Sequence, residues 1–563
     1  MANFTVGDYI AQRLAQIGVR HHFLVPGGDN LALLDRLRAH PSLTGVGCTN
    51  ELNCSLAAEG YARANGIAVC VVTYSVGAFS AFNGIGSAYA ENLPVILISG
   101  APNTHDKDQH LLHHTLGEHD FTYQLEMAKK ITCCAVSIRN AKSAPELVDR
   151  VVWNCIRLQK PGYIELPTNL STEMCVQPGP ISGLDAGHRH VGSVLAAAVT
   201  SVREYLETRQ KPVILAGPKI RSCKAQESLV RLAEAIGCAV VVQPAGKGLF
   251  PETHPQFAGV FWGQVSTLAA DSIVNWSDGL ICVGTLFTDY STVGWTAVST
   301  VPQVVIDADA VTCVTTCFTG VAMCDFLVGL ADTVAWNDSS MTEYARLRPE
   351  IPLQRHGAYG ELTRKEVARR VQLLLGPDMT VFADAGDSWF NGIQLQLPPG
   401  AGFEIEMQWG HIGWSIPASF GYALAKPERR IIVLIGDGAL QVTAQEMSQM
   451  VRHRLPIILV LMNNKGYTIE AEMHAGVYNR IYNWNYVLLM QAFNFSDTGG
   501  RALGLKADTV EEFSEAIELA QAHMDGPSLI ECSIDQEDCS KELITWGHYV
   551  AAANNRSGMT IET

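Results

Sequence analysis

The sequence predicts an α/β protein made of three doubly wound domains with mainly parallel sheets. Short apolar runs, often β-branched, recur along the 563 residues and alternate with helical patterns, which is typical of βαβ units. Because these runs are apolar at nearly every position, the strands are expected to be covered on both faces. The predicted strands are AVCVVTY (68–74), PVILISG (94–100), PVILAG (212–217), CAVVVQ (238–243), GLICVG (279–284), RIIVLIG (430–436), PIILVLM (456–462) and SLIEC (528–532).

Two stretches rich in Pro, Gly, polar residues or charge interrupt this rhythm, at 177–190 and 337–360. Such composition is typical of domain linkers. We therefore expect domains at 1–185, 190–335 and 360–563. The chain has no repeat of fixed period, so a solenoid is not indicated.

The composition excludes several classes of function. A net charge of −16 argues against a general binder of nucleic acid, which needs a basic surface. The apolar runs are far shorter than the roughly 18–20 residues of a membrane span. Only 17% of the residues are charged, so large buried interfaces in an oligomer would fit.

The compartment is predicted from the N-terminus and the cysteines. The first residues lack a basic region followed by an apolar one, so we expect a cytoplasmic protein. The fifteen cysteines are odd in number, dispersed, and without a CxxC pair, which favours reduced core thiols over disulfides.

The strongest local signal is Asp437, which stands between two glycines after one predicted strand and before a helical pattern. A glycine turn over a helix N-terminus is a position that binds diphosphate. The 24 residues at 439–462 supply one helix and one strand, which would bring Asn463 and Asn464 to the same edge of the sheet.

These residues suit magnesium, which prefers oxygen ligands and usually shares them between protein, phosphate and water. Asp437, the Asn464 side chain and the Gly466 carbonyl are the predicted metal ligands, since a glycine lets its carbonyl approach closely. The alternative is an ordinary dinucleotide-type turn followed by a loop. The paired asparagines after one helix and one strand favour the metal and cofactor site.

The Gly-Asp-Gly to Asn-Asn pattern resembles the thiamine-diphosphate motif, and the resemblance extends over almost the whole chain. The family that it resembles is that of the pyruvate decarboxylases, in their fungal and bacterial forms. The matching stretches are HHF (21–23), NELNCSLAAEGYARANG (50–66), SAYAENLPVILISGAPN (87–103), LHHTLG (112–117), DYSTVGW (289–295), GDSWFNG (386–392), EMQWGHIGWSIP (406–417) and GYTIE (466–470).

The resemblance implies thiamine diphosphate and Mg²⁺ as cofactors, with a pyrimidine-binding first domain, a middle domain and a diphosphate-binding third domain. It implies that Glu51 contacts the aminopyrimidine, although an acid after the N-cap Asn50 also suits a helix dipole. It implies that Ile412 is the apolar wedge under the cofactor. The residues expected to contact the cofactor are Gly410, His411, Ile412, Gly436, Asp437, Gly438, Ala439, Asn464, Gly466, Tyr467, Ile469 and Ala385.

The resemblance also identifies the residues expected at the substrate. His113, His114 and Glu470 are the candidates for proton transfer, work that suits groups with tuned pKa values. Trp389 and Ile469 match positions that narrow the substrate pocket, unless they are ordinary core residues. Tyr290 is expected near the entrance of the site.

Three positions depart from the family pattern. Gly28 stands where the family has a catalytic aspartate, and Asp29 follows one residue later, so Asp29 serves only if the loop is remodelled. Ala385 and Ala439 replace a threonine and a serine. Each loses a hydroxyl, and one hydrogen bond is worth about 0.5–1.5 kcal/mol, so cofactor binding would weaken several-fold.

The resemblance therefore implies decarboxylation of a small 2-oxo acid, pyruvate above all, to acetaldehyde and CO₂ through a thiamine-bound enamine. Without the aspartate, the alternative is a carboligase that forms acyloins from a 2-oxo acid donor. A non-catalytic relative that only binds the cofactor is less favoured, because Glu51 and Glu470 are retained. In the family the cofactor lies between domains of two subunits, which implies a homo-oligomer, a dimer or a dimer of dimers.

Overall fold

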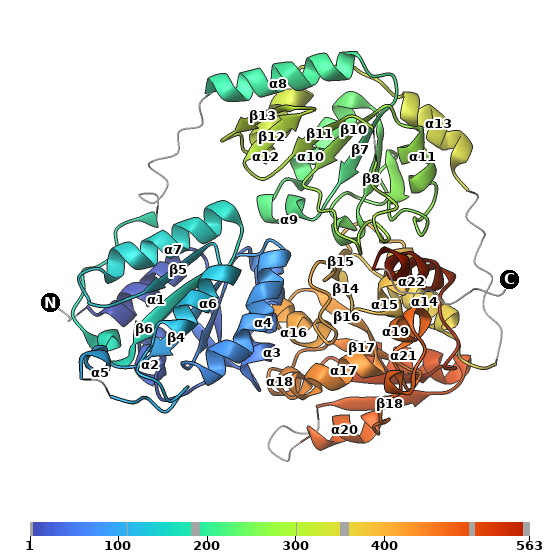
Figure 1. Cartoon of the computed structure of the whole chain (residues 1–563). Coiled ribbons are helices and arrows are strands. Elements are labelled where there is room, and N and C mark those ends of the chain that lie inside the picture. The colour runs from blue at the N-terminus through green and yellow to red at the C-terminus, as the bar shows by residue number, and fades with distance from the viewer. Residues whose placement is uncertain are drawn as a thin grey trace. The chain divides into compact units, whose positions relative to one another are not determined.

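A computed structural model describes residues 4–109, 111–181, 192–299, 301–349, 360–494 and 501–554 of the chain. It confirms the predicted fold class: three sheets of mainly parallel strands with helices on their faces (Figure 1). The chain divides into two compact units. The first unit comprises 1–189, 416–428 and 443–455, and the second comprises 190–415, 429–442 and 456–563.

The first unit contains a six-stranded sheet in which every neighbouring pair is parallel. Its strands, in spatial order, are β2 (Thr44–Gly47), β1 (His21–Leu24), β3 (Ala68–Val72), β4 (Val95–Ala101), β6 (Gly162–Pro167) and β5 (Cys134–Ser137). Its helices are α1 (Val6–Gln16), α2 (Leu31–Ala39), α3 (Glu51–Asn65), α4 (Val76–Ala90), α5 (Thr104–Asp108), α6 (Tyr123–Ile131), α7 (Ala144–Leu158), α18 (Met447–Arg452) and, from residue 416 onward, α16 (Ser415–Ala425).

Helix α3 begins where its sequence predicts, because the Asn50 side chain accepts the backbone N–H of Asn53 at 2.8 Å. It ends at Gly66, whose φ of 95° is the left-handed conformation of a helix C-cap. The middle of α3 approaches α16 so closely that a Cβ on Gly60 would lie 1.9 Å from the Ala418 carbonyl oxygen. Glycine is therefore required where α3 crosses α16.

The second unit contains two sheets. The seven-stranded one has the order β13 (Thr316–Thr319), β12 (Ala310–Cys313), β11 (Gln303–Ile306), β10 (Gly279–Val283), β7 (Pro212–Ala216), β8 (Ala239–Val242) and β9 (Phe257–Val260), and β12 pairs antiparallel with both neighbours. Its helices are α8 (Gly192–Glu207), α9 (Lys219–Cys223), α10 (Gln226–Ile236), α11 (Ala270–Trp276), α12 (Met323–Ala331) and α13 (Ser339–Leu347).

The other sheet of the second unit is parallel throughout, with the order β15 (Gly402–Ile405), β14 (Met379–Ala383), β16 (Arg430–Gly436), β17 (Ile458–Asn463), β19 (Ser528–Ser533) and β18 (Leu503–Ala507). Its helices are α14 (Arg364–Leu374), α15 (Asp387–Gln394), α17 (Asp437–Thr443), α19 (Thr468–Met473), α20 (Tyr486–Ala492), α21 (Val510–Ala522) and α22 (Lys541–Ala553).

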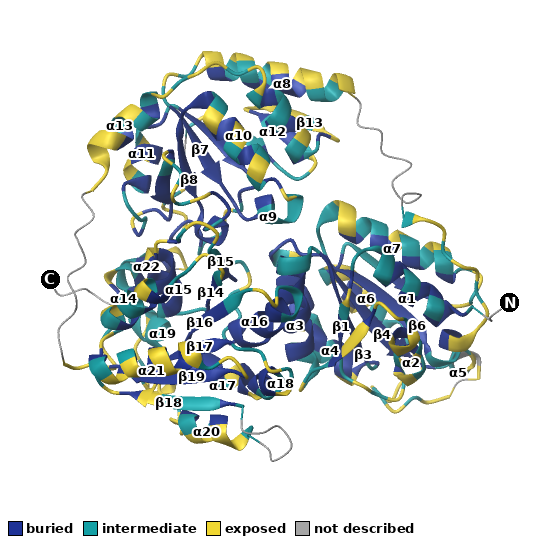
Figure 2. Ribbon diagram, turned by 180° about the vertical axis from the view of Figure 1, so that it is seen from behind, coloured by how far each residue is buried: buried dark blue, intermediate teal, exposed yellow. Residues whose placement is uncertain are grey.

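All eight strands predicted from apolar runs are present, and the central ones are buried along their length, as the dark strands in Figure 2 show. The helical pattern at 439–453 is divided into α17, a 3₁₀ turn at Ala444–Glu446, and α18. The predicted linker at 337–360 is wrong in its first part, because 339–347 form α13. Tyr344 of α13 is 2% exposed and packs beside the seven-stranded sheet, so an apolar contact outweighs the polar composition.

The predicted domain limits at 185 and 190 lie outside the described residues, and those at 335 and 360 stay predictions. All fifteen cysteines are free thiols, most of them buried or half-buried, with Cys317 exposed. In the part of the chain that the structure describes, no helix is both long and apolar enough to span a membrane.

Candidate active site

Asp437 lies where strand β16 meets helix α17, at the carboxyl edge of the parallel sheet of the second unit. Its Oδ1 accepts the N–H of Gly438 at 2.7 Å, and its Oδ2 accepts the N–H of Lys465 at 2.5 Å. Burial raises the pKa of Asp437 to about 6, although these backbone N–H groups favour the ionised form. The carboxylate is thus fixed in orientation and placed at a site where a cation would stabilise its charge.

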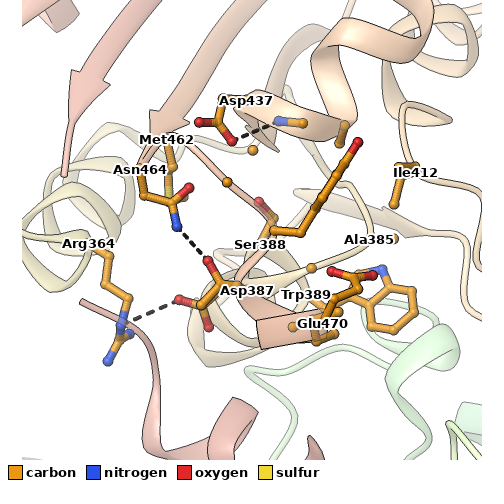
Figure 3. Close-up of a pocket in the computed structure, with 18 of the residues that line it drawn as sticks. Arg364, Ala385, Asp387, Ser388, Trp389, Ile412, Asp437, Met462, Asn464 and Glu470 are labelled. Atoms are coloured by element: carbon orange, nitrogen blue, oxygen red, sulfur yellow. Dashed lines mark hydrogen bonds and ion pairs between the residues drawn. The ribbon is translucent and has the colours of Figure 1, made fainter. Parts of the chain in front are cut away.

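Asn464 and Gly466 follow the neighbouring strand β17 and line the same pocket as Asp437. The Asn464 amide nitrogen donates to the Thr468 hydroxyl at 2.5 Å, which leaves its oxygen for another partner. A Cβ on Gly466 would lie 2.7 Å from the Asn479 carbonyl oxygen, so only glycine fits there. Figure 3 shows Asp437 and Asn464 at the left of the pocket and Ile412 and Glu470 at its right.

The residues present suit Mg²⁺ and a diphosphate group. One carboxylate, one amide oxygen and one backbone carbonyl form an all-oxygen set, as Mg²⁺ prefers. The described residues contain no group of three or more His, Cys, Asp or Glu side chains that could hold a metal ion. A Cβ on Gly436 would meet only open space, which leaves room beside the N-terminus of α17.

The loop after β15 carries Gly410 and Ile412 and is held by two buried carboxylates. Glu406, 1% exposed, accepts the N–H groups of Trp409, Gly410 and His411, each at 2.8 Å. Asp384, fully buried, accepts the N–H groups of Gly413 at 2.9 Å and Ser415 at 2.8 Å. Five backbone N–H groups therefore fix the conformation of this loop, on both sides of Ile412.

The turn before helix α15 places Ala385 and Gly386 along the pocket, and the first turn of the helix places Ser388 there. Its first residue, Asp387, accepts the Ser540 hydroxyl at 2.5 Å and lies 3.5 Å from the Arg364 Nε. Burial raises the pKa of Asp387. Ala385 lines the pocket, and its methyl group cannot form a hydrogen bond.

Glu470, Trp389 and Tyr290 meet in the same pocket. Burial raises the pKa of Glu470, so this carboxyl keeps its proton to a higher pH than a solvent-exposed one. Trp389 is 2% exposed and packs edge-on against Tyr290, with ring centroids 6.0 Å apart. A Cβ on Gly410 would lie 3.1 Å from the Tyr290 ring, so Tyr290 packs directly on the loop that carries Ile412.

The first unit carries the remaining candidates. Glu51 is the first residue of α3, and a Cβ on Gly77 would lie 3.0 Å from its Oε1 and 3.0 Å from the Thr73 methyl group. The Asp29 carboxylate accepts the Thr73 hydroxyl at 3.3 Å. Thr73 therefore lies beside Asp29 and beside Gly77, and Gly77 is next to Glu51. Gly28 is exposed, and a Cβ there would meet no atom within 4 Å.

His113 and His114 lie in the segment between α5 and α6. Their ring centroids are 4.3 Å apart. His113 also packs edge-on against Tyr74 and Phe121, at 6.1 Å and 6.0 Å. Its Nδ1 is buried and has no hydrogen-bond partner among the described residues. The structure thus places the pair on one surface, with His114 the more exposed of the two.

The sequence patterns missed several residues of this site. Glu406 and Asp384 are not predicted, because the sequence does not show which acidic side chains are buried. The pocket also includes Arg364, Asp387, Ser388, Met462, Asp538 and Trp546. Asp387 and Ser388 could have been found from the sequence. They follow a glycine after an apolar run, as Asp437 and Gly438 do at 436–438.

Comparison with known proteins agrees with this geometry. The profiles of the thiamine pyrophosphate enzymes match the chain with the N-terminal TPP binding domain at 4–123, the central domain at 199–323 and the C-terminal TPP binding domain at 384–532. Pyruvate decarboxylase of Neurospora crassa is 62% identical over 98% of this chain and 97% of its own.

Further relatives cover the chain to the same extent. A probable pyruvate decarboxylase of Schizosaccharomyces pombe is 55% identical, over 98% of this chain and 97% of its own length. Pyruvate decarboxylase 1 of Pisum sativum is 42% identical, over 98% of this chain and 94% of its own. The chain therefore belongs to the pyruvate decarboxylase family of thiamine pyrophosphate enzymes.

Proposed function

We propose that this protein catalyses the non-oxidative decarboxylation of pyruvate to acetaldehyde and CO₂, with thiamine diphosphate and Mg²⁺ as cofactors. The observation that carries the proposal is the pocket shared by Asp437, Asn464, Glu470 and Ile412, in a chain 62% identical to a pyruvate decarboxylase. Carboligation, the alternative that Gly28 raised, is less supported, since the relatives compared here are all named decarboxylases.

The second unit binds and orients the cofactor in this proposal. When bound, thiamine diphosphate supplies the electron sink that accepts the bonding pair released with CO₂. Asp437, Asn464 and the Gly466 carbonyl hold Mg²⁺, and the Gly438 and Ala439 turn faces the diphosphate. Ile412, which lines the pocket on the loop fixed by Glu406, would give the cofactor an apolar support. Preorganised groups of this kind cost no reorganisation during the reaction.

Proton transfer is assigned to four side chains, Glu470, Glu51, His113 and His114. Conversion of the pyruvate anion into acetaldehyde and CO₂ consumes one proton, so a donor is needed in every turnover. Glu470 is a donor candidate because burial raises its pKa. Glu51 holds a proton on the aminopyrimidine, and His113 and His114 hold or move one at the substrate. Trp389 and Ile469 limit the room for the substrate side chain, which favours pyruvate over bulky 2-oxo acids.

We also propose a cytoplasmic homo-oligomer, a dimer or a dimer of dimers. Large apolar side chains of the first unit are exposed, among them Val76 at 75% and Leu112 at 61%, and a second subunit would cover such a surface. Fifteen free thiols suit a reducing compartment. An active monomeric fraction on sizing chromatography would contradict the oligomer.

The test is product analysis of the purified protein supplied with thiamine diphosphate, Mg²⁺ and pyruvate. We expect CO₂ and acetaldehyde in equal amounts, dependent on both cofactors, and a lower rate with phenylpyruvate. Asp437→Asn should abolish the activity. Asp378→Asn, an exposed aspartate of the same sheet region, is the matched control and should retain it. No CO₂ from any 2-oxo acid at cofactor saturation would contradict the proposal.

A further inference from the structure

The segment that carries the two histidines is anchored at its C-terminal end by Tyr123, the first residue of α6. The Tyr123 hydroxyl donates to the Thr115 hydroxyl at 2.9 Å, one residue after His114. The same hydroxyl is hydrogen-bonded to the side chain of Ser75, which precedes α4. Tyr123 therefore joins the histidine segment, defined here as residues 111–122, to the start of α4.

The next residue, Gln124, continues this connection into the core. Gln124 is fully buried, and its side-chain oxygen accepts the N–H of Ser75 at 2.6 Å. Its side-chain nitrogen donates to the Ser99 hydroxyl at 2.9 Å and to the Tyr163 hydroxyl at 2.5 Å. Ser75 has a φ of 54°, an uncommon backbone conformation for a serine, and Gln124 satisfies the N–H that this conformation turns inward.

The connection ends on a buried carboxyl. The Tyr163 hydroxyl donates to Glu165 Oε2 at 3.1 Å, and the Ser137 hydroxyl donates to Oε1 at 2.8 Å. Glu165 is 6% exposed, and burial raises its pKa. Because Tyr163 has a single proton and gives it to Glu165, its oxygen is free to accept from Gln124. The backbone N–H of Ser75 can only donate, so it fixes the oxygen of the Gln124 amide on its side and leaves the nitrogen to donate to Ser99 and Tyr163.

The histidine segment borders a pocket of the first unit. A cavity of about 350 Å³ lies against Phe121 and Thr122 of this segment, with Glu165 also in its wall. Side chains that line an open pocket make fewer packing contacts on that side. Two hydrogen bonds hold the segment. The Tyr123 hydroxyl donates to Thr115, and the Tyr74 hydroxyl donates to the Phe121 carbonyl at 2.9 Å.

We propose that Tyr123 and Gln124 are positioning residues that hold His113 and His114 at the substrate, through the buried hydrogen-bond chain that ends on Glu165. This inference rests on the proposed function of the two histidines. Its physical basis is that a partly broken buried network is costly, so the chain is either complete or rearranged. Loss of one hydroxyl would therefore release the histidine segment, and a displacement of about 1 Å at a catalytic group can reduce a rate about 100-fold.

The test uses Tyr123→Phe in the cofactor-saturated protein. The matched control is Tyr9→Phe, because the Tyr9 hydroxyl is also hydrogen-bonded in the first unit, to Asp149 at 2.8 Å, and is not part of the chain. We expect kcat of Tyr123→Phe to fall about 10- to 100-fold relative to the control, with KM changed by less than about twofold, because the lost contact acts in the transition state. Hydrogen exchange of residues 111–122 should become faster, and exchange in the rest of the first unit should not.

The inference is overturned if kcat of Tyr123→Phe stays within twofold of the control, or if exchange accelerates evenly over the first unit. Thr115→Val removes the same hydrogen bond from the half-buried end, so it gives an answer even where Tyr123→Phe folds poorly. His113→Gln and His114→Gln distinguish a failure of the proposed role of the histidines from a failure of their positioning by Tyr123. Unchanged activity in both would reject the proposed role of the histidines, whereas loss in these variants alone would reject only the positioning by Tyr123.

Discussion

The carboxylate of Glu406 accepts the backbone N–H of His411 at 2.8 Å. The same side chain accepts two more N–H groups of the loop, and it is 1% exposed. A buried carboxylate with three such partners is strongly fixed, because hydrogen bonds to a charged group are about twice as strong as neutral ones. The loop that supports the proposed cofactor is therefore set before any ligand binds.

Glu406→Gln should weaken the binding of thiamine diphosphate. A glutamine replaces one acceptor oxygen by an NH₂ group, which would face a backbone N–H and leave it unsatisfied at a cost of about 1–3 kcal/mol. We expect an increase in Kd of about 5- to 150-fold, measured by quenching of tryptophan fluorescence. Glu366→Gln is the control, since Glu366 bonds Arg369 at 2.8 Å outside the pocket. Equal Kd values for the two variants would contradict the role of Glu406.

Gly28→Asp should fold normally and favour release of aldehyde. Gly28 is exposed, and a Cβ there meets no neighbour, so an aspartate fits without strain. The added carboxyl would supply a proton donor that Asp29 does not, because the Asp29 carboxylate is engaged by Thr73. The effect is measured as the share of acyloin among the products formed from pyruvate in the presence of added acetaldehyde.

The expected result for Gly28→Asp is a smaller share of acyloin than in the unchanged protein, at an unchanged melting temperature. Asp29→Asn is the companion variant and should alter the share little. A large increase in acyloin with Asp29→Asn would show instead that Asp29 has taken over the missing function.

Ala439→Ser should tighten cofactor binding. Ala439 is 5% exposed and lines the pocket at the start of α17, where a hydroxyl would face the diphosphate. One hydrogen bond of about 0.5–1.5 kcal/mol corresponds to a decrease in Kd of about 2- to 10-fold. Ala425→Ser, half-buried at the end of α16, is the control and should leave Kd unchanged. Weaker binding in Ala439→Ser would mean that the serine displaces the diphosphate.

The activity should decline toward alkaline pH with the titration of Glu470. Burial raises the pKa of this carboxyl, so its protonated form persists to a higher pH, and a proton donor loses its function as the pH rises through that value. Glu470→Gln should lower kcat by about 10²- to 10⁴-fold and remove this alkaline decline. The pH profile of kcat checks it, and an activity that rises with pH through the same range would require the ionised form.

Arg63→Met should destabilise the first unit strongly. The Arg63 guanidinium lies 2.9 Å from Glu59 and 3.2 Å from Glu91, and all three side chains are buried. Removing one partner from a buried ion pair costs about 3–5 kcal/mol, because it leaves charges uncompensated. Lys129→Met, which breaks an exposed pair with Glu126, should cost less than about 1 kcal/mol. Calorimetric melting of the two variants gives the comparison.

The loss in Arg63→Met should be smaller at pH 5 than at pH 8. Burial raises the pKa of Glu59, so the folded protein binds a proton there at a pH where the unfolded chain does not. Protonation at acidic pH removes the uncompensated charge, and that relief is lost as the pH rises. A loss of stability that is independent of pH would show that packing, and not charge, is the cause.

The strands and the position of Asp437 at a sheet edge could be predicted because both depend on residues that are neighbours in the sequence. A short apolar run rich in β-branched residues and bounded by turn residues predicts a buried strand, and Asp437 between two glycines after such a run specifies a turn at the edge of a sheet. The same reasoning failed for residues 339–347. Their polar composition suggested a linker, but a helix forms there because Tyr344 reaches the core.

The roles of Glu406, Arg63 and Glu165 could not be predicted from the sequence. Arg63 and Glu59 are four residues apart on a helix, a spacing more common in exposed pairs, and only the packing of α4 on α3 buries them. Gln124 and Glu165 are far apart in the chain and are joined through Tyr163, because α6 packs on β6, the strand that carries both Tyr163 and Glu165.

The fold class, the family and the gathering of Asp437, Asn464 and Gly466 at one pocket followed from the sequence alone, because turn chemistry, strand periodicity and motifs are local properties. The tertiary structure decided which carboxylates are buried, which backbone N–H groups they hold, and what anchors the histidine segment. Those outcomes depend on desolvation and on contacts between residues distant in the chain. A short stretch of the sequence shows neither the desolvation nor the contacts.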